Sequence, residues 1–444
     1  MIKLFRIFIE KLKKDANFRQ VFSNVVWLYF DSFFQMAVGF LIGAWVARYL
    51  GPEQYGKLNY AISFTALFGI FTTFQINNVV VRQIIKLPDR KNQIFGSAIV
   101  IKMIGFFISS VLIFIATRFT NFEDSTIKVL VLIYTISLFF QIPTLIGYWF
   151  ESTLKSKYTT ITNTIVFIIS SILRVLLVLA GAGLVYFGFI GLLEYILISI
   201  FLITVYALNK QNIFAWRAEW KVIKSLLAES WPILLAAMFS VIYLKLDKIL
   251  VGDMVNQATL GNYSIGTAIT DPLVFVATAI TVSVYPAIIS LKDNDEKLYR
   301  QRLISLEKLL FVLSLCLAIP VTLFSGQIIH LLYGGQYSEA PIILSIYIWS
   351  LVPAFSGAAA VKTLFVEKLQ HYIPVKAFLG ALVSILLNLI LIPKIGAIGA
   401  CISGVSASIM VNYLSNYFFK ATRPLFLIQT RSFLEVIFFW IKKT

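Results

Sequence analysis

Residues 23–64 of the chain, SNVVWLYFDSFFQMAVGFLIGAWVARYLGPEQYGKLNYAISF, decide its fold. The first part of this stretch is an apolar run in which Asp31 is the one charged side chain before Arg48. A helix of that length crosses a hydrocarbon layer of roughly 30 Å. Gly51 and Pro52 then end the run, because proline cannot continue the hydrogen-bond ladder of a helix, and a second apolar run follows. A span, a break and a second span are typical of a polytopic membrane protein.

The composition of the whole chain agrees with this interpretation. Of its 444 residues 59% are hydrophobic and 13% are charged, whereas a soluble domain is nearer half apolar and a quarter charged. This balance excludes a soluble enzyme, a nucleic-acid-binding module and a disulfide scaffold. The two cysteines, Cys316 and Cys401, and the two histidines, His330 and His371, lie in separate segments, and a structural zinc site needs about four convergent ligands. We therefore expect no metal, no cofactor and no nucleic acid as a partner.

Twelve apolar runs are long enough to span the membrane, so we predict an all-α integral membrane protein with about twelve transmembrane helices. The predicted spans are residues 21–46, 58–81, 93–117, 127–149, 158–181, 184–208, 226–251, 259–289, 304–325, 339–361, 373–392 and 396–419. Residues 1–20 alternate between apolar and basic side chains, which is typical of an amphipathic helix on the inner membrane surface. Residues 432–441 are too few to span and predict an interfacial segment.

The distribution of lysine and arginine predicts the orientation of these spans. With the amino terminus inside, the inner segments carry 27 of the 38 basic residues, the outer loops carry five, and the other six lie within spans. Cytoplasmic loops are the ones enriched in Lys and Arg. We therefore expect both termini in the cytoplasm, and we attribute the net charge of +17 to this topology and to anionic headgroups of membrane lipids.

The second half of the chain repeats features of the first. Gly56 in EQYGKLNYAISF aligns with Gly261 in ATLGNYSIGTAI at an offset of 205, and Lys102 aligns with Lys308 at 206. Two halves of six spans each enter the membrane in the same direction, so they are parallel repeats related by an axis along the membrane normal. The predicted parts are a cytoplasmic segment 1–20, a six-helix bundle 21–208, a linker 209–225, a second six-helix bundle 226–419 and a cytoplasmic or interfacial tail 420–444.

With these features in place, residues 23–64 resemble the start of the polysaccharide transporter and O-antigen flippase family, a branch of the multidrug/oligosaccharidyl-lipid/polysaccharide exporter superfamily. The family shows a similar first span that ends in Ala-Arg-Tyr-Leu-Gly-Pro, followed by an acidic residue and a glycine. The LKLDKILVGD run before LGNYSIG in the second half is also similar. The motif residues, which lie at span ends, are Arg48, Gly51, Pro52, Glu53, Gly56 and Gly261. For Arg48, Glu53 and Gly56 a structural role is favoured over substrate contact.

This resemblance implies a MATE-like architecture and a flippase rather than an enzyme. Family members move undecaprenyl-diphosphate-linked oligosaccharides across the bacterial inner membrane. The expected partners are therefore a polyprenyl-diphosphate-linked oligosaccharide, membrane lipids and other polysaccharide assembly proteins. The expected product is O-antigen or a similar surface polysaccharide. The expected mechanism is alternating access, in which the two bundles rock about a central cavity.

Polar and basic side chains inside the spans are candidates for substrate binding, because a charge at the bilayer centre costs about 2.5–3.5 kcal/mol and usually faces a cavity or a partner. Arginine and lysine are natural partners of phosphate, so we predict a basic cavity for the diphosphate or acidic sugars. Its candidate residues are Arg174, Lys102, Lys245, Lys248, Asn24 and Gln35. Pairing with a carboxylate, or snorkelling to headgroups, is the alternative for each cation; it is favoured for Lys245 and Lys248, whereas substrate contact is favoured for Arg174.

Carboxylates within the spans are candidates for coupling transport to a proton or sodium gradient, because a buried carboxyl group can bind an ion as the cavity opens and closes. The candidates are Asp31, Asp271, Glu194 and Asp247. Neutralisation of neighbouring cations is an equally good interpretation of these residues.

Two other classes of protein stay open at this point. A drug or cation antiporter of the same superfamily would place acidic groups in its cavity and few deep cations, whereas here the cations at least match the carboxylates within the spans. A membrane-embedded polysaccharide polymerase or ligase usually needs a sizeable outer loop, and every predicted loop is short. The flippase is the leading interpretation.

Overall fold

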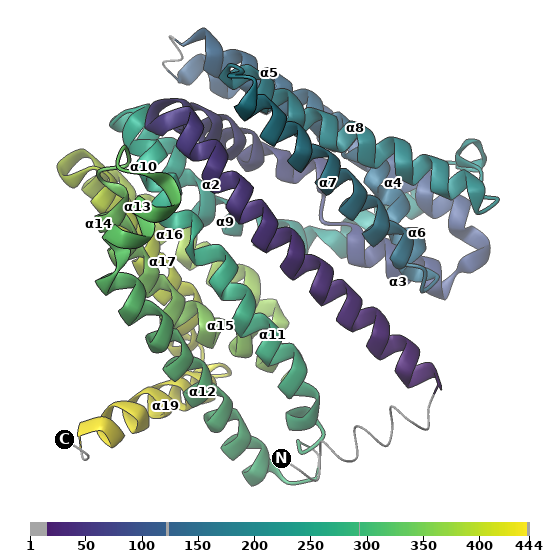
Figure 1. Ribbon diagram of the computed structural model, residues 1–444. Coiled ribbons are helices and arrows are strands. Elements are labelled where there is room, and N and C mark those ends of the chain that lie inside the picture. Colours follow the sequence, from purple (N-terminus) through teal and green to yellow (C-terminus); the bar gives the residue numbers. More distant parts are fainter. Residues whose placement is uncertain (1–15, 121–123, 293, 442–444) are drawn as a thin grey trace.

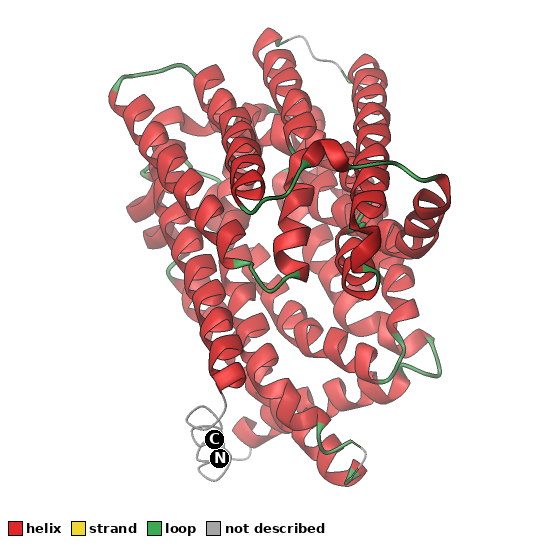
Figure 2. Ribbon diagram, turned by 90° about the vertical axis from the view of Figure 1, so that its right-hand side faces the viewer, coloured by secondary structure: helices red, strands yellow, loops and turns green. Residues whose placement is uncertain are grey.

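The computed structural model describes most of the chain, namely residues 16–120, 124–292 and 294–441. Side chains are described for these residues with a few exceptions, namely 16–33, 119, 271 and 439–441. The amphipathic helix expected at the amino terminus lies outside the described residues up to position 15. Within the described part all regular elements are helices (Figure 2).

The first half of the chain contributes seven α-helices and the second half eleven. They are α2 (Ala16–Thr73), α3 (Asn77–Lys86), α4 (Lys91–Phe119), α5 (Ser125–Phe140), α6 (Ile146–Ser152), α7 (Lys157–Leu179) and α8 (Leu184–Leu208). The second half has α9 (Trp220–Met254), α10 (Gln257–Ala268), α11 (Thr270–Ile289), α12 (Glu296–Leu323), α13 (Ser325–Tyr333), α14 (Ala340–Tyr347), α15 (Leu351–Val366), α16 (Ile373–Ile395), α17 (Ala397–Ile409), α18 (Ser415–Phe418) and α19 (Arg423–Ile441). These counts refer to the described residues.

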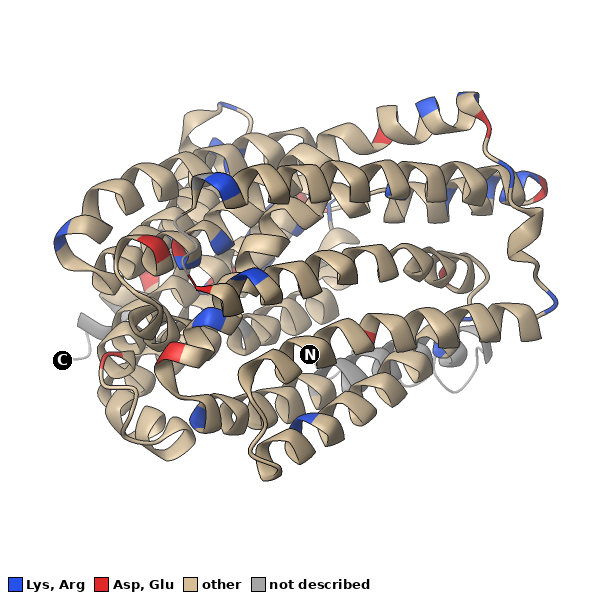
Figure 3. Ribbon diagram, turned by 90° about the horizontal axis from the view of Figure 1, so that it is seen from above, with Lys and Arg blue, Asp and Glu red and all other residues tan. Residues whose placement is uncertain are grey.

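The helices form two bundles that meet at one end and diverge toward the other (Figure 1). Helices α2 to α8 make the first bundle, and the second part of α9 with α10 to α18 makes the second. We call the end at which the kink of α2 meets α10 the closed end. The opposite end carries the basic segments 82–92, 209–225 and 290–303, and we call it the basic end. Figure 3 shows long stretches of helix without charge between the charged positions, as expected of membrane-spanning helices.

The described helices occupy all twelve predicted places. α8 has the bounds predicted for the sixth span, and α4, α7 and α16 begin within two residues of the predicted starts. Ten segments of the described chain are long and apolar enough to cross a membrane, and the first of them, Phe34–Lys86, holds two predicted spans. α9 fills another predicted place although it is not among the ten. The prediction of an all-α membrane protein is confirmed.

The first two predicted spans are joined by a sharp kink and not by a loop. α2 runs through both, and within it Gly51 leaves the helical conformation, with φ 76° and ψ 170°. A positive φ suits glycine, which lacks the Cβ that would clash there, and Pro52 has the fixed φ that suits a first helical turn. The break predicted at Gly51 and Pro52 is therefore present, but it takes a single residue.

The second predicted span, 58–81, ends earlier than expected. α2 stops before Phe74 and Gln75, which take positive φ values of 44° and 52°, and the short helix α3 follows. A Cβ on Gly105 of α4 would lie 2.0 Å from the carbonyl oxygen of Phe71. The backbones of α2 and α4 therefore touch where α2 ends, and a hydropathy pattern does not register such a contact.

Two matching helix breaks reflect the internal repeat. The fourth predicted span is interrupted by a 3-10 turn at Ile142–Leu145, between α5 and α6, and the tenth by another at Ile348–Ser350, between α14 and α15. These turns begin 206 residues apart, which is the offset that aligns Lys102 with Lys308. Corresponding spans of the two bundles therefore share the same irregularity.

The start of α9 packs on the first bundle, which differs from the predicted boundary. Ile223 and Leu226 are buried in an apolar cluster with Ile76, Phe95 and Phe150 of the first bundle. The second bundle was expected to begin at position 226. The chain instead passes from one bundle to the other part-way along α9, because the first turns of this helix bury their apolar side chains against α3, α4 and α6.

The predicted interfacial tail forms α19, which lies across the basic end of the second bundle (Figure 1). Gln429 and Ser432 of α19 are fully buried, and Ser432 donates a hydrogen bond to the carbonyl oxygen of Ile304 on α12 at 3.3 Å. Glu435 forms an ion pair with Lys308 of α12. These polar contacts make α19 an integral part of the second bundle.

Candidate functional site

The two bundles touch backbone to backbone at the closed end. A Cβ on Gly56 of α2 would lie 1.8 Å from the carbonyl oxygen of Gln257 on α10, and a Cβ on Gly261 would lie 1.9 Å from that of Pro52. The contacts are reciprocal, because Gln257 and Gly261 follow Pro52 and Gly56 by 205 residues. Reciprocal contacts are the property of a two-fold axis, so this axis passes between α2 and α10. The two glycines let the helices cross with no side chain between them.

Hydrogen bonds between the bundles hold the same end together. The fully buried Tyr60 of α2 donates to Asp253 Oδ1 of α9 at 2.7 Å. Tyr337, which precedes α14, donates to the carbonyl oxygen of Ala47 on α2 at 2.6 Å. Each of these bonds joins α2 to the second bundle, so each must break if the bundles separate here.

The charged residues of the family motif contact protein groups at the closed end. Gln336 donates to the carbonyl oxygen of Arg48 at 2.6 Å. Lys57 lies 2.7 Å from Glu53 and 2.8 Å from Asp124, the residue that caps α5. The hydrogen bond from Lys57 is the largest influence on Asp124 and lowers the pKa of its carboxyl group, and the backbone N–H of the first turn of α5 lowers it further. This ion pair ties the α2 kink to α5.

At the basic end the bundles splay apart. α2 and α11 diverge toward this end (Figure 1). A link remains through the start of α9, where Glu229 forms an ion pair with Arg82 of α3 and accepts a hydrogen bond from Gln83 at 3.1 Å. The molecule is therefore joined by buried contacts at one end and mainly by exposed polar contacts at the other, which is the asymmetry that alternating access requires.

Two cations of the predicted basic cavity, Arg174 and Lys102, belong to the first bundle and have partners there. Arg174 of α7 forms an ion pair with Glu194 of α8 at 2.5 Å. Lys102 of α4 is 2% exposed, and its Nζ lies 3.4 Å from Thr144 Oγ1 and 5.4 Å from the ring centroid of Tyr148. Arg174 thus has the carboxylate partner that the sequence left open as an alternative. Contact of Arg174 and Lys102 with substrate stays a prediction.

The candidates on α9 surround a buried carboxylate. Asp247 is 3% exposed and accepts a hydrogen bond from Tyr263 of α10. Lys245 and Lys248 flank it in the sequence and are partly buried, as is Gln35 on α2. The structure therefore brings Asp247 to a tyrosine inside the second bundle.

Three candidate side chains, those of Asn24, Asp31 and Asp271, lie outside the described side chains, and their roles stay predictions. Sequence reasoning also missed a buried carboxylate, Glu307 of α12, which is 2% exposed. The sequence did mark Glu307 as a candidate, because it is a carboxylate inside the predicted span 304–325, directly before Lys308.

A comparison with family models gives the family of the chain. The model of Polysacc_synt, the polysaccharide biosynthesis proteins, matches residues 21–292, which is more than half of the sequence. The chain belongs to this family. A curated relative, the "probable flippase AglR" of Haloferax volcanii, is 31% identical to this family member over 245 residues, which are 53% of the chain and 49% of the relative. The chain thus matches about half the length of this relative.

Solved structures share the fold over most of the chain. The lipid II flippase MurJ in an inward closed conformation superposes with a TM-score of 0.67 and 17% identity, over 94% of this chain and 93% of that one. A multidrug resistance MATE family transporter of the MOP superfamily, in its inward-facing conformation, gives a TM-score of 0.63 and 15% identity, over 90% and 94%. This polysaccharide biosynthesis family member therefore has the MATE-like transporter fold that the resemblance implied.

Proposed function

We propose that this family member is a flippase that moves a polyprenyl-diphosphate-linked oligosaccharide from the cytoplasmic to the outer face of its membrane. The observation that carries the proposal is the pair of bundles joined at Gly56 and Gly261 and splayed at the basic end. In the finer form of the proposal, the membrane is the bacterial inner membrane and both termini are cytoplasmic. The carrier is then undecaprenyl diphosphate, and its oligosaccharide is a repeat unit of O-antigen or a similar surface polysaccharide.

The geometry supports a rocking mechanism about the closed end. The sugar–diphosphate head enters between the bundles from the basic end, while the polyprenyl tail stays in the lipid. Release on the other side requires that the hydrogen bonds from Tyr60 to Asp253 and from Tyr337 to Ala47 break. A backbone-to-backbone crossing suits this opening, because α2 and α10 separate at Gly56 and Gly261 without disengaging interlocked side chains.

The buried cations supply the chemistry for the diphosphate in this proposal. Arginine binds carboxylate and phosphate with the same planar fork, so Arg174 would exchange Glu194 for the headgroup when it arrives. Lys102 would act as a second, point-like charge, released from Thr144. Binding of a proton or a sodium ion by Asp31, Asp271, Glu194 or Asp247 would then couple export to an ion gradient.

The native cell provides the test of this function. The gene is deleted in a strain in which initiation of glycan synthesis can be switched off, and polyprenyl-linked glycans are assigned to a membrane face. Complete single repeat units trapped on the cytoplasmic face, with loss of surface polymer, are expected. Normal polymer with altered sensitivity to cationic dyes would instead indicate an antiporter. Units that reach the outer face without being polymerised would indicate an enzyme of the pathway.

A further inference from the structure

A continuous chain of hydrogen bonds crosses the interior of the second bundle. Lys376 Nζ of α16 donates to Asn416 Oδ1 of α18 at 2.8 Å, and Asn416 Nδ2 donates to Gln429 Oε1 of α19 at 2.9 Å. Gln429 Nε2 donates to Ser356 Oγ of α15 at 2.7 Å, and Ser356 donates to Glu307 Oε2 of α12 at 2.6 Å. We call these five residues the relay. Every bond in it points from the ammonium group toward the carboxylate.

The relay is buried throughout. Lys376 is 4% exposed and Glu307 is 2% exposed, and the three groups between them are buried as well. Among the described residues neither charged end takes part in an ion pair. Charges inside a membrane protein are costly and are retained mainly where they serve transport. Two amides and a hydroxyl, polarised in one direction, are the only link between these two charges that the described residues show.

A second irregularity lies beside the relay. Residues Met410–Leu414 form a π-helical turn between α17 and α18. Within it, the carbonyl oxygen of Asn412 accepts hydrogen bonds from Gln429 Nε2 at 3.1 Å and from Asn416 Nδ2 at 3.3 Å. Such turns are rare and frequently mark functional sites. Here the turn holds the two amides of the relay in place.

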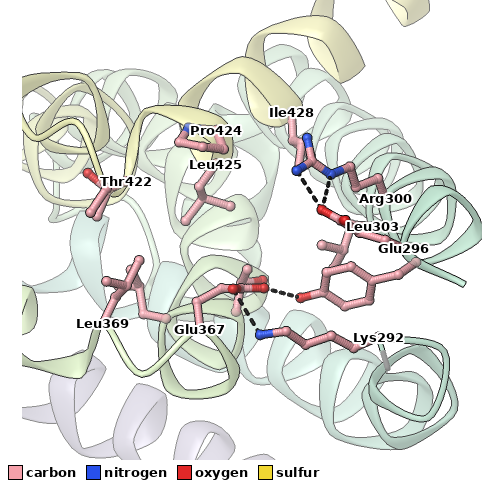
Figure 4. Close-up of a pocket in the computed structure, with 14 residues that line it drawn as sticks. Lys292, Glu296, Arg300, Leu303, Glu367, Leu369, Thr422, Pro424, Leu425 and Ile428 are labelled. Carbon is pink, nitrogen blue, oxygen red and sulfur yellow. Dashed lines mark hydrogen bonds and ion pairs between the residues drawn. The ribbon is translucent and has the colours of Figure 1, made fainter. Parts of the chain in front are cut away.

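A pocket at the basic end of the second bundle approaches Glu307. A pocket of about 390 Å³ opens between α12, the end of α15 and the start of α19 (Figure 4). Leu303 lines this pocket and lies one helical turn before Glu307 on the same face of α12. Thr363 lines it from α15, seven residues after Ser356, and therefore on the same face as that serine. Leu303, which lines the pocket, thus precedes Glu307 by about 6 Å along the axis of α12.

The surroundings of Glu307 leave its carboxylate available to bind a proton. Other titratable groups on the helices packed with α12 have partners of their own, namely Tyr285 with Thr363, Glu367 with Lys292 and Tyr299, and Glu435 with Lys308 and Arg431. Helices α13 and α14 carry no Asp, Glu, Lys or Arg. No described cation therefore competes with a proton for the Glu307 carboxylate.

We propose that Glu307 is a proton-binding site of the transport cycle, with Lys376 as the distant counter-charge of its ionised form through the relay. The inference rests on the proposed function, because it assigns the coupling ion to this transporter. A sodium ion is disfavoured as the ligand, since it needs several oxygen ligands and the Ser356 hydroxyl is the one hydrogen-bonding partner of Glu307 among the described residues. A proton needs no cage of oxygen ligands, so one carboxylate is sufficient.

The relay accepts this proton with little rearrangement. When Glu307 is ionised, the Ser356 hydroxyl donates to it. When Glu307 is protonated, its O–H donates to Ser356 Oγ, which has a lone pair free for that bond, and the serine hydroxyl turns away. The amides of Gln429 and Asn416 keep their orientation in both states. Proton binding at Glu307 therefore switches one hydroxyl rotor and leaves the packing of five helices intact.

The first test measures the proton directly on the purified full-length protein in liposomes. Infrared difference spectra between acid and neutral pH are expected to show the carbonyl band of a buried protonated carboxyl group in the native protein. Glu307→Gln should remove the Glu307 component of this band, and Glu367→Gln at the pocket mouth, the matched control, should leave the band unchanged. A residual band is assigned to Asp247, which is also buried. A band of undiminished intensity in Glu307→Gln would overturn the proposal. This readout does not depend on export of any glycan, so it also separates a failure here from a failure of the proposed flippase function.

A second test asks whether the two charges depend on each other. Glu307→Gln leaves the Lys376 ammonium without its counter-charge, so the melting temperature of this variant should fall below that of the native protein. The double variant Glu307→Gln/Lys376→Met should recover stability, because it removes both charges. If the double variant loses as much stability as Glu307→Gln and Lys376→Met lose together as single variants, the relay does not couple its two charged ends.

Coupling to transport is measured in cells. Surface polymer made by the native protein should fall when a protonophore is added, and the small amount made by Glu307→Gln should not respond to it. Native export that is indifferent to the protonophore would overturn the coupling role, even if the infrared band is assigned to Glu307.

Discussion

The sharpest consequence of the structure concerns the glycine crossing at the closed end. In Gly56→Ala the new Cβ would lie 1.8 Å from the carbonyl oxygen of Gln257, whereas an ordinary contact begins at 3.4 Å. The α2 and α10 backbones must therefore separate by about 1.6 Å, and no flexible side chain is present to yield instead. Overpacking of this kind costs about 1–3 kcal/mol. Since the strain acts on the contact between bundles, the ratio of molecules with the closed end shut to molecules with it open should fall roughly 5- to 150-fold.

The assay follows the accessibility of a buried residue next to the crossing. Leu260, which precedes Gly261 in α10, is 0% exposed. A Leu260→Cys reporter in a Cys316→Ser background should therefore react slowly with a membrane-impermeant maleimide added on the side of the membrane at which the closed end lies. Cys401 is buried and present in every variant, so it contributes the same background throughout. Gly56→Ala should accelerate the reaction by the factor above. Gly43→Ala, in the same helix but with nothing within 4 Å of its new Cβ, is the matched control. Equal labelling rates for the two variants would refute the reasoning.

The reciprocal geometry adds a stricter requirement. Gly261→Ala should act like Gly56→Ala, because its Cβ would meet Pro52 at 1.9 Å across the same axis. Once one alanine has pushed the helices apart, the second meets little further resistance. The double variant should therefore be less perturbed than the sum of the single variants. Additive effects would mean that the two glycines do not share one contact.

Three further predictions follow from the contacts of the two bundles. Tyr60→Phe removes a hydrogen bond to the exposed carboxylate of Asp253 on α9, at a cost of about 0.5–1.5 kcal/mol, and should raise labelling of the same reporter; an unchanged rate would show that this bond does not hold the closed end shut. Lys57 lowers the pKa of the Asp124 carboxyl group from its usual value of 3.8. The folded state therefore gains stability above pH 3.8, and this stability is lost as the pH falls through the lower pKa of the folded state. Thermal melts down to about pH 3 should show that acid lowers the melting temperature less in Asp124→Asn than in the native protein. Arg174→Ala and Lys102→Ala should each lower glycan export, and normal expression with native export in both would end the basic-cavity hypothesis.

Much of the fold was predictable from local features of the sequence. The apolar runs placed α8 at its observed bounds and put helices at all the predicted positions, because the length and polarity of a run determine whether it can cross a membrane. Gly51 and Pro52 predicted the kink for an equally local reason. The repeat offset paired Gly56 with Gly261, although it could not show that the two residues touch.

The functional groups were harder to predict, because a charge in a span does not reveal its partner. Arg174 and Glu194 lie 20 residues apart on neighbouring helices, and only their packing brings them to 2.5 Å. Glu307 was passed over because its environment comes from α15 and α19, distant segments that no local pattern connects to it.

By itself the sequence determined the all-helical membrane fold, its repeat and its kinked first hairpin, since each of these depends on hydrophobicity or backbone chemistry summed over neighbouring residues. The tertiary structure alone decided which end of the bundles is closed, where α9 leaves the first bundle and which buried charges meet. These outcomes depend on contacts between segments as far as 290 residues apart. Such contacts arise from how helices pack in three dimensions, and the order of residues along one helix does not contain them.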